Sequence, residues 1–83
     1  MVLIDAGYGN YVNPERIISV AAPESLPVRR LVQDAKNAGR VIDISCGKKT
    51  KSVIITDSDH IICSAEEPAV IAQKIKGSDP LSN

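Results

Sequence analysis

Short runs of apolar, mostly β-branched residues alternate with turn residues along this chain, and they predict a fold that mixes strands with helices. Five runs have the length and composition of strands: residues 2–4, 16–21, 40–45, 52–56 and 60–64. Asp57-Ser58-Asp59 separates the last two runs, and such residues are typical of a hairpin turn. Gly7-Tyr8-Gly9 predicts a tight turn after the first run, because glycine accepts positive φ without strain.

Residues 25–39 carry the signals of a helix with one apolar side. Ser25 is a good N-cap, and Pro27 in the first turn loses no hydrogen bond because the first N–H groups of a helix are unpaired. Gly39 stands where helices most often end in glycine. The apolar side is formed by Val28, Leu31, Val32, Ala35 and Ala38, and the opposite side carries Arg29, Gln33 and Lys36.

A second helix is expected from Glu66-Glu67-Pro68 onward, because acids and proline favour the positive first turn. The predicted order is therefore ββ-α-βββ-α, an α+β fold with a mainly antiparallel sheet. The runs at 53–55 and 61–63 are apolar at consecutive positions, whereas a strand buried on one face alternates. We therefore expect both faces of these strands to be covered, either by a helix or by another subunit.

Composition narrows the class of protein. The 83 residues predict one domain, and a core without Phe or Trp must bury many small aliphatic side chains. Small domains often need additional stabilisation, so oligomerisation is expected. Cys46 and Cys63 are far apart and follow no signal peptide, and we interpret them as reduced, structural thiols of a cytoplasmic protein. No stretch approaches the ~20 apolar residues of a membrane-spanning helix.

The loop between the third and fourth predicted strands concentrates positive charge. The whole chain is neutral, with ten basic and ten acidic residues, yet Lys48, Lys49 and Lys51 fall within four positions of Gly47. No acidic residue lies between Asp43 and Asp57. A glycine loop with unpaired lysines suits a polyanion, and nucleic acid is the commonest one. The alternative is a solvated loop whose lysines only maintain solubility.

Motifs of catalysis are incomplete in this chain. Gly47-Lys48 lacks the first glycine and the following Ser or Thr of a phosphate-binding P-loop. Asp57, Asp59 and His60 resemble a metal-ligand group, but acids at a hairpin usually cap their own backbone. A lone histidine supports no catalytic triad. We therefore expect a protein that is not an enzyme and that binds no metal or cofactor.

Several segments together resemble the RemA family of small bacterial DNA-binding regulators of extracellular-matrix genes. The resemblance runs from about Gly7 to Ala65. Its most specific segments are Gly7-Tyr8-Gly9-Asn10, Pro23-Glu24-Ser25-Leu26-Pro27, Gly47-Lys48-Lys49-Thr50-Lys51 and Thr56-Asp57-Ser58-Asp59-His60. It implies one RemA-like α+β domain, placed over residues 1–76, and a protomer that assembles into a ring. The composition of residues 77–83 separately predicts a disordered tail.

The resemblance also implies which residues contact DNA. Lys48 and Lys49 match the family's basic DNA-contacting pair, which is often Arg-Arg, and Arg16 and Pro27 match positions important in the family. Lysine lacks the bidentate fork with which arginine binds guanine, so phosphate contact is favoured here. We add Lys51 to this set, and Arg29 either as a further DNA contact or as a subunit contact.

These observations predict a cytoplasmic, nucleoid-associated transcriptional regulator that binds double-stranded DNA as a homo-oligomeric ring larger than a dimer. A ring multiplies the weak contacts of each protomer through effective concentration. The alternative is a structural or protein-interaction ring whose basic loops bind RNA or an acidic partner.

Overall fold

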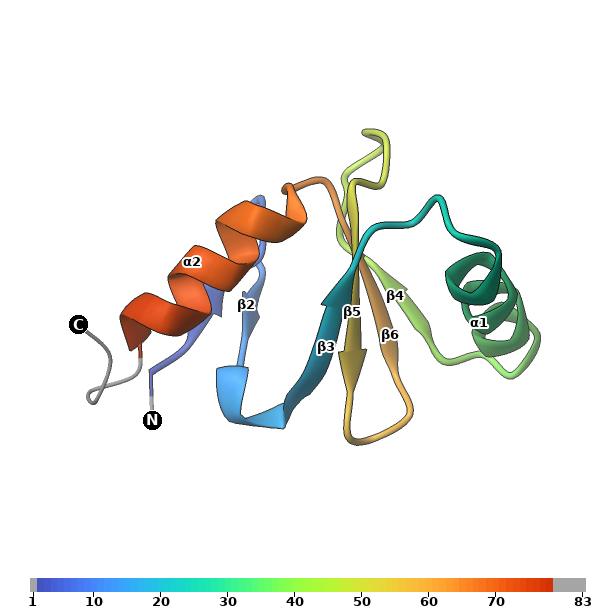
Figure 1. Cartoon of the computed structure of the whole chain (residues 1–83), viewed down its shortest axis with the longest axis horizontal. Helices are drawn as coiled ribbons and strands as arrows, with labels where there is room; N and C mark the ends of the chain where they lie inside the picture. The colour runs from blue at the N-terminus through green and yellow to red at the C-terminus, as the bar shows by residue number, and fades with distance from the viewer. Residues whose placement is uncertain (1, 79–83) are drawn as a thin grey trace.

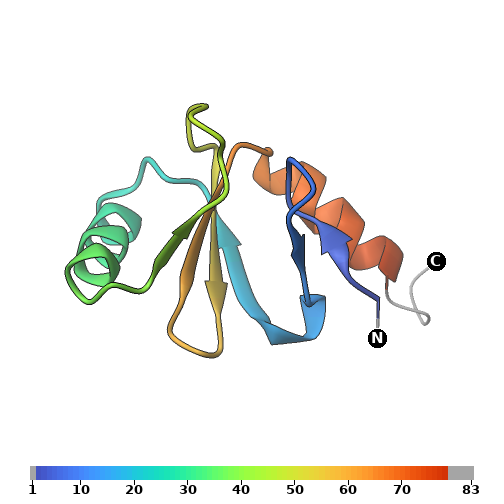
Figure 2. The same cartoon turned by 180° about the vertical axis from the view of Figure 1, so that it is seen from behind.

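A four-stranded sheet forms the centre of the computed structural model, which describes residues 2–78. Its strands are β3 (Ile17–Ala21), β5 (Ser52–Thr56), β6 (Ile61–Ser64) and β4 (Val41–Asp43), in that order across the sheet. Helix α1 (Leu26–Asn37) lies on one face, and helix α2 (Pro68–Ser78) lies on the other with a small sheet of β1 (Ile4–Asp5) and β2 (Tyr11–Val12) (Figures 1 and 2). The two helices thus enclose the central sheet.

The pairing of the strands confirms the α+β prediction. β5 is antiparallel to both β3 and β6, and only β4 runs parallel to its neighbour β6. The sheet is therefore mainly antiparallel, as the sequence predicts. Ring formation is a property of several chains and is considered below.

The N-terminal strands differ in detail from the prediction. β1 pairs with β2, a two-residue strand that the apolar pattern does not reveal, and the two form a sheet of their own. The turn between them has φ of 120°, 53° and 75° at Gly7, Tyr8 and Gly9, which confirms the expected tight turn. The strand predicted over residues 16–21 begins at Ile17 in the structure. Residues Pro14–Arg16 instead form a 3-10 turn, in which the Asn13 side chain accepts a hydrogen bond from the Glu15 N–H.

Both helices lie where local signals place them. The Ser25 hydroxyl accepts from the Val28 N–H at 3.4 Å, Pro27 occupies the first turn of α1, and Gly39 follows the helix with φ of 71°. α2 continues to Ser78, two residues beyond the domain boundary predicted at 76. The remainder of the predicted tail, residues 79–83, lies outside the described residues.

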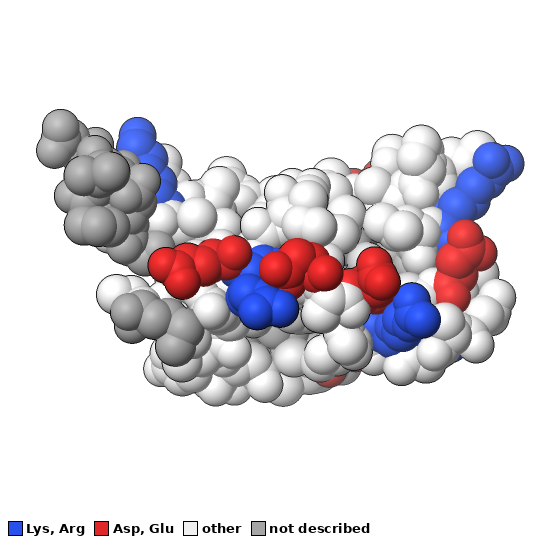
Figure 3. Space-filling model, turned by 90° about the horizontal axis from the view of Figure 1, so that it is seen from below, with Lys and Arg blue, Asp and Glu red and all other residues white. Residues whose placement is uncertain are grey.

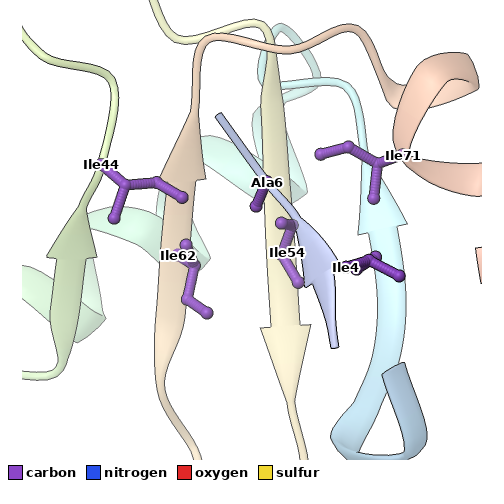
Figure 4. Packing of buried hydrophobic residues seen from close by; sticks show 6 residues of the cluster. All are labelled: Ile4, Ala6, Ile44, Ile54, Ile62 and Ile71. Carbon is purple, nitrogen blue, oxygen red and sulfur yellow. The ribbon is translucent and has the colours of Figure 1, made fainter. Parts of the chain in front are cut away.

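Two hydrophobic clusters explain why the central strands are apolar at consecutive positions. On the α2 face, β1, β5, β6 and α2 contribute to a cluster of Ile4, Ala6, Ile44, Ile54, Ile62 and Ile71 (Figure 4). On the α1 face, Ala35 packs with Val53, Ile61 and Cys63. Both faces are covered, as predicted, and the cover comes from helices of the same chain. Each fully buried isoleucine contributes about 1.5–3 kcal/mol, which offsets the absence of Phe and Trp.

Candidate nucleic-acid interface

The basic loop that follows β4 is fixed at its base and exposed at its tip. Lys48 N–H donates to the Ser45 carbonyl at 3.0 Å, and the two central residues of this turn, Cys46 and Gly47, have φ of 54° and 78°. Two consecutive positive φ values define a type I′ turn, which favours glycine at the second central position. Farther on, the Lys51 N–H donates to the Ser64 carbonyl at 2.8 Å. The loop projects at the top of the sheet (Figure 1).

Asp43 holds the start of this loop. Its Oδ1 accepts from the Ser45 hydroxyl at 2.6 Å and from the Ser45 N–H at 2.9 Å. These two bonds, that of the hydroxyl first, lower the pKa of Asp43; burial opposes them, and the positive charge of Lys36 adds a smaller lowering effect. Asp43 is therefore a carboxylate at neutral pH. Sequence reasoning missed this residue, although Asp two positions before Ser is a signal of a side-chain-to-backbone turn.

The three loop lysines differ in their surroundings. All three are exposed, but Lys51 Nζ lies 3.8 Å from Glu67 Oε1 at the start of α2. The sequence shows no acid near the loop, and the structure corrects this for Lys51, because the chain returns past the loop after β6. Among residues 2–78, Lys48 and Lys49 form no ion pair within 4 Å. Of the three loop lysines, therefore, Lys48 and Lys49 remain available to bind a polyanion.

Arg29 lies on the same side of the molecule as the loop. Its side chain lines a groove of about 330 Å³ between α1 and the sheet, together with Gln33 and Lys36 of α1 and Thr50 of the loop. The apolar floor of this groove includes Val32 and Val53. The structure therefore brings Arg29 and Thr50 of the basic loop to one groove, although they are about twenty positions apart in the sequence.

Arg16 lies at the opposite end of the sheet. Its Nε lies 2.8 Å from Asp57 Oδ1, and its carbonyl accepts from the Asp57 N–H at 3.0 Å. β5 separates this pair from the basic loop by roughly 17 Å, at ~3.3 Å per residue. Acidic and basic side chains alternate on the surface at this end (Figure 3). Within one protomer, therefore, Arg16 does not share a surface with Lys48 and Lys49.

The charges divide unevenly along the chain. Residues 26–51, which include α1, β4 and the basic loop, hold seven of the ten basic residues and two of the ten acids, a net charge of +5. The rest of the neutral chain has a net charge of −5. A count by segment, instead of over the whole chain, reveals this asymmetry directly from the sequence. The positive charge of residues 26–51 favours attraction of a polyanion to the part of the molecule formed by α1, β4 and the basic loop.

The hairpin acids bind neighbouring arginines. Asp57 pairs with Arg16, Asp59 Oδ2 lies 3.8 Å from Arg40 Nη1, and His60 Nδ1 lies 2.9 Å from the Ser58 hydroxyl. Within residues 2–78, no group of three His, Cys, Asp or Glu side chains is arranged to hold a metal ion. The two cysteines are free thiols, and burial, with the Asp43 charge, raises the pKa of Cys63.

Comparison with known proteins identifies the family. The family model described as extracellular matrix regulatory protein A-like, or RemA-like, matches residues 3–75, a longer range than the motifs that carry the resemblance. The chain belongs to the RemA-like family. It is 45% identical over 82 residues to a "putative regulatory protein" of Geobacillus thermodenitrificans, covering 99% of this chain and 94% of that one. A relative from Moorella thermoacetica, named in the same words, is 44% identical over 81 residues and covers 98% and 89%.

Membership of the RemA-like family, together with the names of these relatives, supports a regulatory role. The family model ends three residues before the end of α2, so it includes every strand and the basic loop. Neither helix of the described part of the chain is long and apolar enough to span a membrane.

Proposed function

We propose that this RemA-like chain is a transcriptional regulator that binds double-stranded DNA through the loop of Lys48 and Lys49. The observation that carries the proposal is the pair of exposed lysines on a turn fixed by Asp43, without an ion pair among the described residues. An exposed ammonium that is already paired gains little from phosphate, whereas an unpaired one releases counterions from DNA when it binds. Lys51, paired with Glu67, contributes less.

The proposed regulator works as a closed ring. The two faces of the sheet are covered within the chain, so their apolar character no longer supports assembly. Support comes instead from the edge strands, where Ile18 of β3 is 69% exposed and Ile42 of β4 is 46% exposed. Exposed apolar edge strands favour association with other chains. Two different edges that meet head to tail close into a ring when the rotation permits.

Charge asymmetry favours the same mode of association. The +5 segment, residues 26–51, of one protomer attracts the acidic remainder of the next, which brings unlike surfaces together. A ring of this kind repeats the basic loop at fixed spacing and links weak DNA contacts. By family, its targets include genes of the extracellular matrix, and its place of action is the cytoplasmic nucleoid.

Binding measurements with matched variants test this function. Fluorescence anisotropy compares a labelled duplex with a single-stranded RNA of the same length, using wild type, Lys48→Ala/Lys49→Ala and a control, Arg30→Ala/Lys76→Ala. The control removes the same charge from exposed positions away from the loop. We expect the loop variant alone to lose duplex binding while retaining the wild-type mass in light scattering. Tighter binding of RNA than of duplex would instead favour the RNA-binding ring.

A further inference from the structure

One side of α1 carries three hydrogen-bonding side chains in a row beside the basic loop. Arg29, Gln33 and Lys36 stand four and three positions apart, which places them along one stripe of a helix. All three are exposed, and all three line the groove between α1 and the sheet, which Thr50 of the loop and the carboxylate of Asp43 also line. The row therefore continues the surface of the proposed DNA contact.

The row takes no part in the hydrophobic packing of α1. The helix contacts the sheet through Ala35, with Val28 and Val32 partly buried beside it. Arg29 and Lys36 form no ion pair within 4 Å among the described residues. The Gln33 amide nitrogen donates to Asn37 Oδ1 at 3.2 Å, which orients the amide along the helix. None of the three side chains is needed to hold α1 on the sheet.

The chemistry of the row differs from that of the loop. A lysine ammonium on a loop is a point charge suited to phosphate, which carries no sequence information. The arginine and glutamine of the row differ, because arginine binds the O6 and N7 of guanine with its fork and glutamine binds the N6 and N7 of adenine. A helix ~10–12 Å in diameter matches a major groove ~12 Å wide. The 12 residues of α1 extend about 18 Å at ~1.5 Å each, enough to follow several base pairs.

We propose that Arg29 and Gln33 of α1 contact base edges in the major groove of duplex DNA, while Lys36, Lys48 and Lys49 hold the adjacent phosphates. The helix row then determines which sequence is preferred, and the loop determines how strongly any sequence is bound. This inference rests on the proposed function, since it requires that the chain bind duplex DNA. Its ligand is duplex DNA, to which the +5 segment containing both elements is complementary in charge.

The test separates preference from affinity. A preferred duplex is first selected by the wild-type protein from a randomised library, and its Kd is compared with that of a scrambled duplex of equal length. We define the preference as the Kd for the scrambled duplex divided by the Kd for the preferred duplex. For Gln33→Ala we expect this ratio to fall roughly 5- to 150-fold, as for loss of one bidentate base contact. The salt dependence should stay unchanged, because glutamine carries no charge. Arg29→Ala should also lower the ratio.

Arg30→Ala is the matched control, because Arg30 neighbours Arg29 and carries the same charge but does not line the groove. We expect it to leave the ratio unchanged. If Gln33→Ala and Arg29→Ala bind DNA with the wild-type ratio, the helix row is only solvated and this inference is overturned, while the proposed function stands. A lower oligomeric mass of Arg29→Ala would overturn it too, by showing a subunit contact. Failure of wild type to bind any duplex would refute both.

Discussion

The attachment of the basic loop to Asp43 predicts a pH-dependent loss of stability when this carboxylate is removed. Asp43→Ala abolishes both hydrogen bonds to Ser45, whose side chain is buried with 2% of the residue exposed. A buried hydroxyl left without its acceptor costs about 1–3 kcal/mol. Unfolding free energies run at ~0.05–0.15 kcal/mol per residue, so a chain of this size has roughly 4–12 kcal/mol in total. The loss is therefore a substantial part of the whole.

Asp43→Asn isolates the charge from the hydrogen bonds, because the amide oxygen can still accept from Ser45. Charge-assisted bonds are about twice as strong as neutral ones, so this variant should lie between wild type and Asp43→Ala at pH 7. Since folding lowers the pKa of Asp43, its carboxylate stabilises the fold fully above the unfolded value of ~4. That contribution disappears as the pH falls through the lower pKa of the folded state.

Urea unfolding, followed by circular dichroism at a fixed protomer concentration, measures both effects. With a slope of ~1–2 kcal/mol per molar urea, Asp43→Ala should lower the midpoint by about 0.5–3 M at pH 7. The gap between the unfolding midpoints of wild type and Asp43→Asn should be present at pH 7 and should close in acid, once the pH falls through the lowered pKa of Asp43 in the folded state. A gap that is the same at both pH values, or equal midpoints for wild type and Asp43→Ala at pH 7, would refute the assigned role of Asp43.

The remaining predictions concern the core, the loop and the assembly. Ile54→Ala, at a fully buried position, should cost about 2–5 kcal/mol in urea unfolding, whereas Val2→Ala, at an exposed position, should change the stability by less than about 0.5 kcal/mol. Glu67→Gln frees Lys51 and should tighten duplex binding in low salt, with no gain in high salt. Lys48→Arg/Lys49→Arg should hold or raise duplex affinity, and weaker binding would contradict phosphate contact. Light scattering at micromolar concentration should give a mass above a dimer, and 8.9 kDa would contradict the ring.

Local signals predicted the helices and strands well. The Ser25 cap, the Pro27 turn and Gly39 each act within a few residues, and α1 accordingly begins and ends where they stand. The consecutive apolar positions around Ile54 also predicted burial on both faces. The short strand β2 was missed, because a two-residue strand has no periodicity to detect.

The arrangement of the candidate site depends on contacts between distant residues, which one sequence does not reveal. Glu67 approaches Lys51 only because β6 leads the chain back past the loop, and Arg16 pairs with Asp57 across 41 positions. The groove that joins Arg29 to Thr50 likewise exists only after α1 packs on the sheet. Sequence reasoning identified Arg29 and the loop as carriers of positive charge. It did not reveal that Arg29 and the loop residue Thr50 line one groove, or that Arg16 lies at the other end of the sheet.

The salt dependence of duplex binding tests the central claim most directly. If Lys48 and Lys49 each neutralise a phosphate, the Lys48→Ala/Lys49→Ala variant should lose about 1.8 units from the slope of log affinity against log salt for each engaged protomer. Its affinity should fall below detection in moderate salt, and Arg30→Ala/Lys76→Ala should retain the wild-type slope. Equal slopes and equal affinities for wild type and the loop variant would show that the loop lysines are only solvated and that DNA, if bound, contacts another surface.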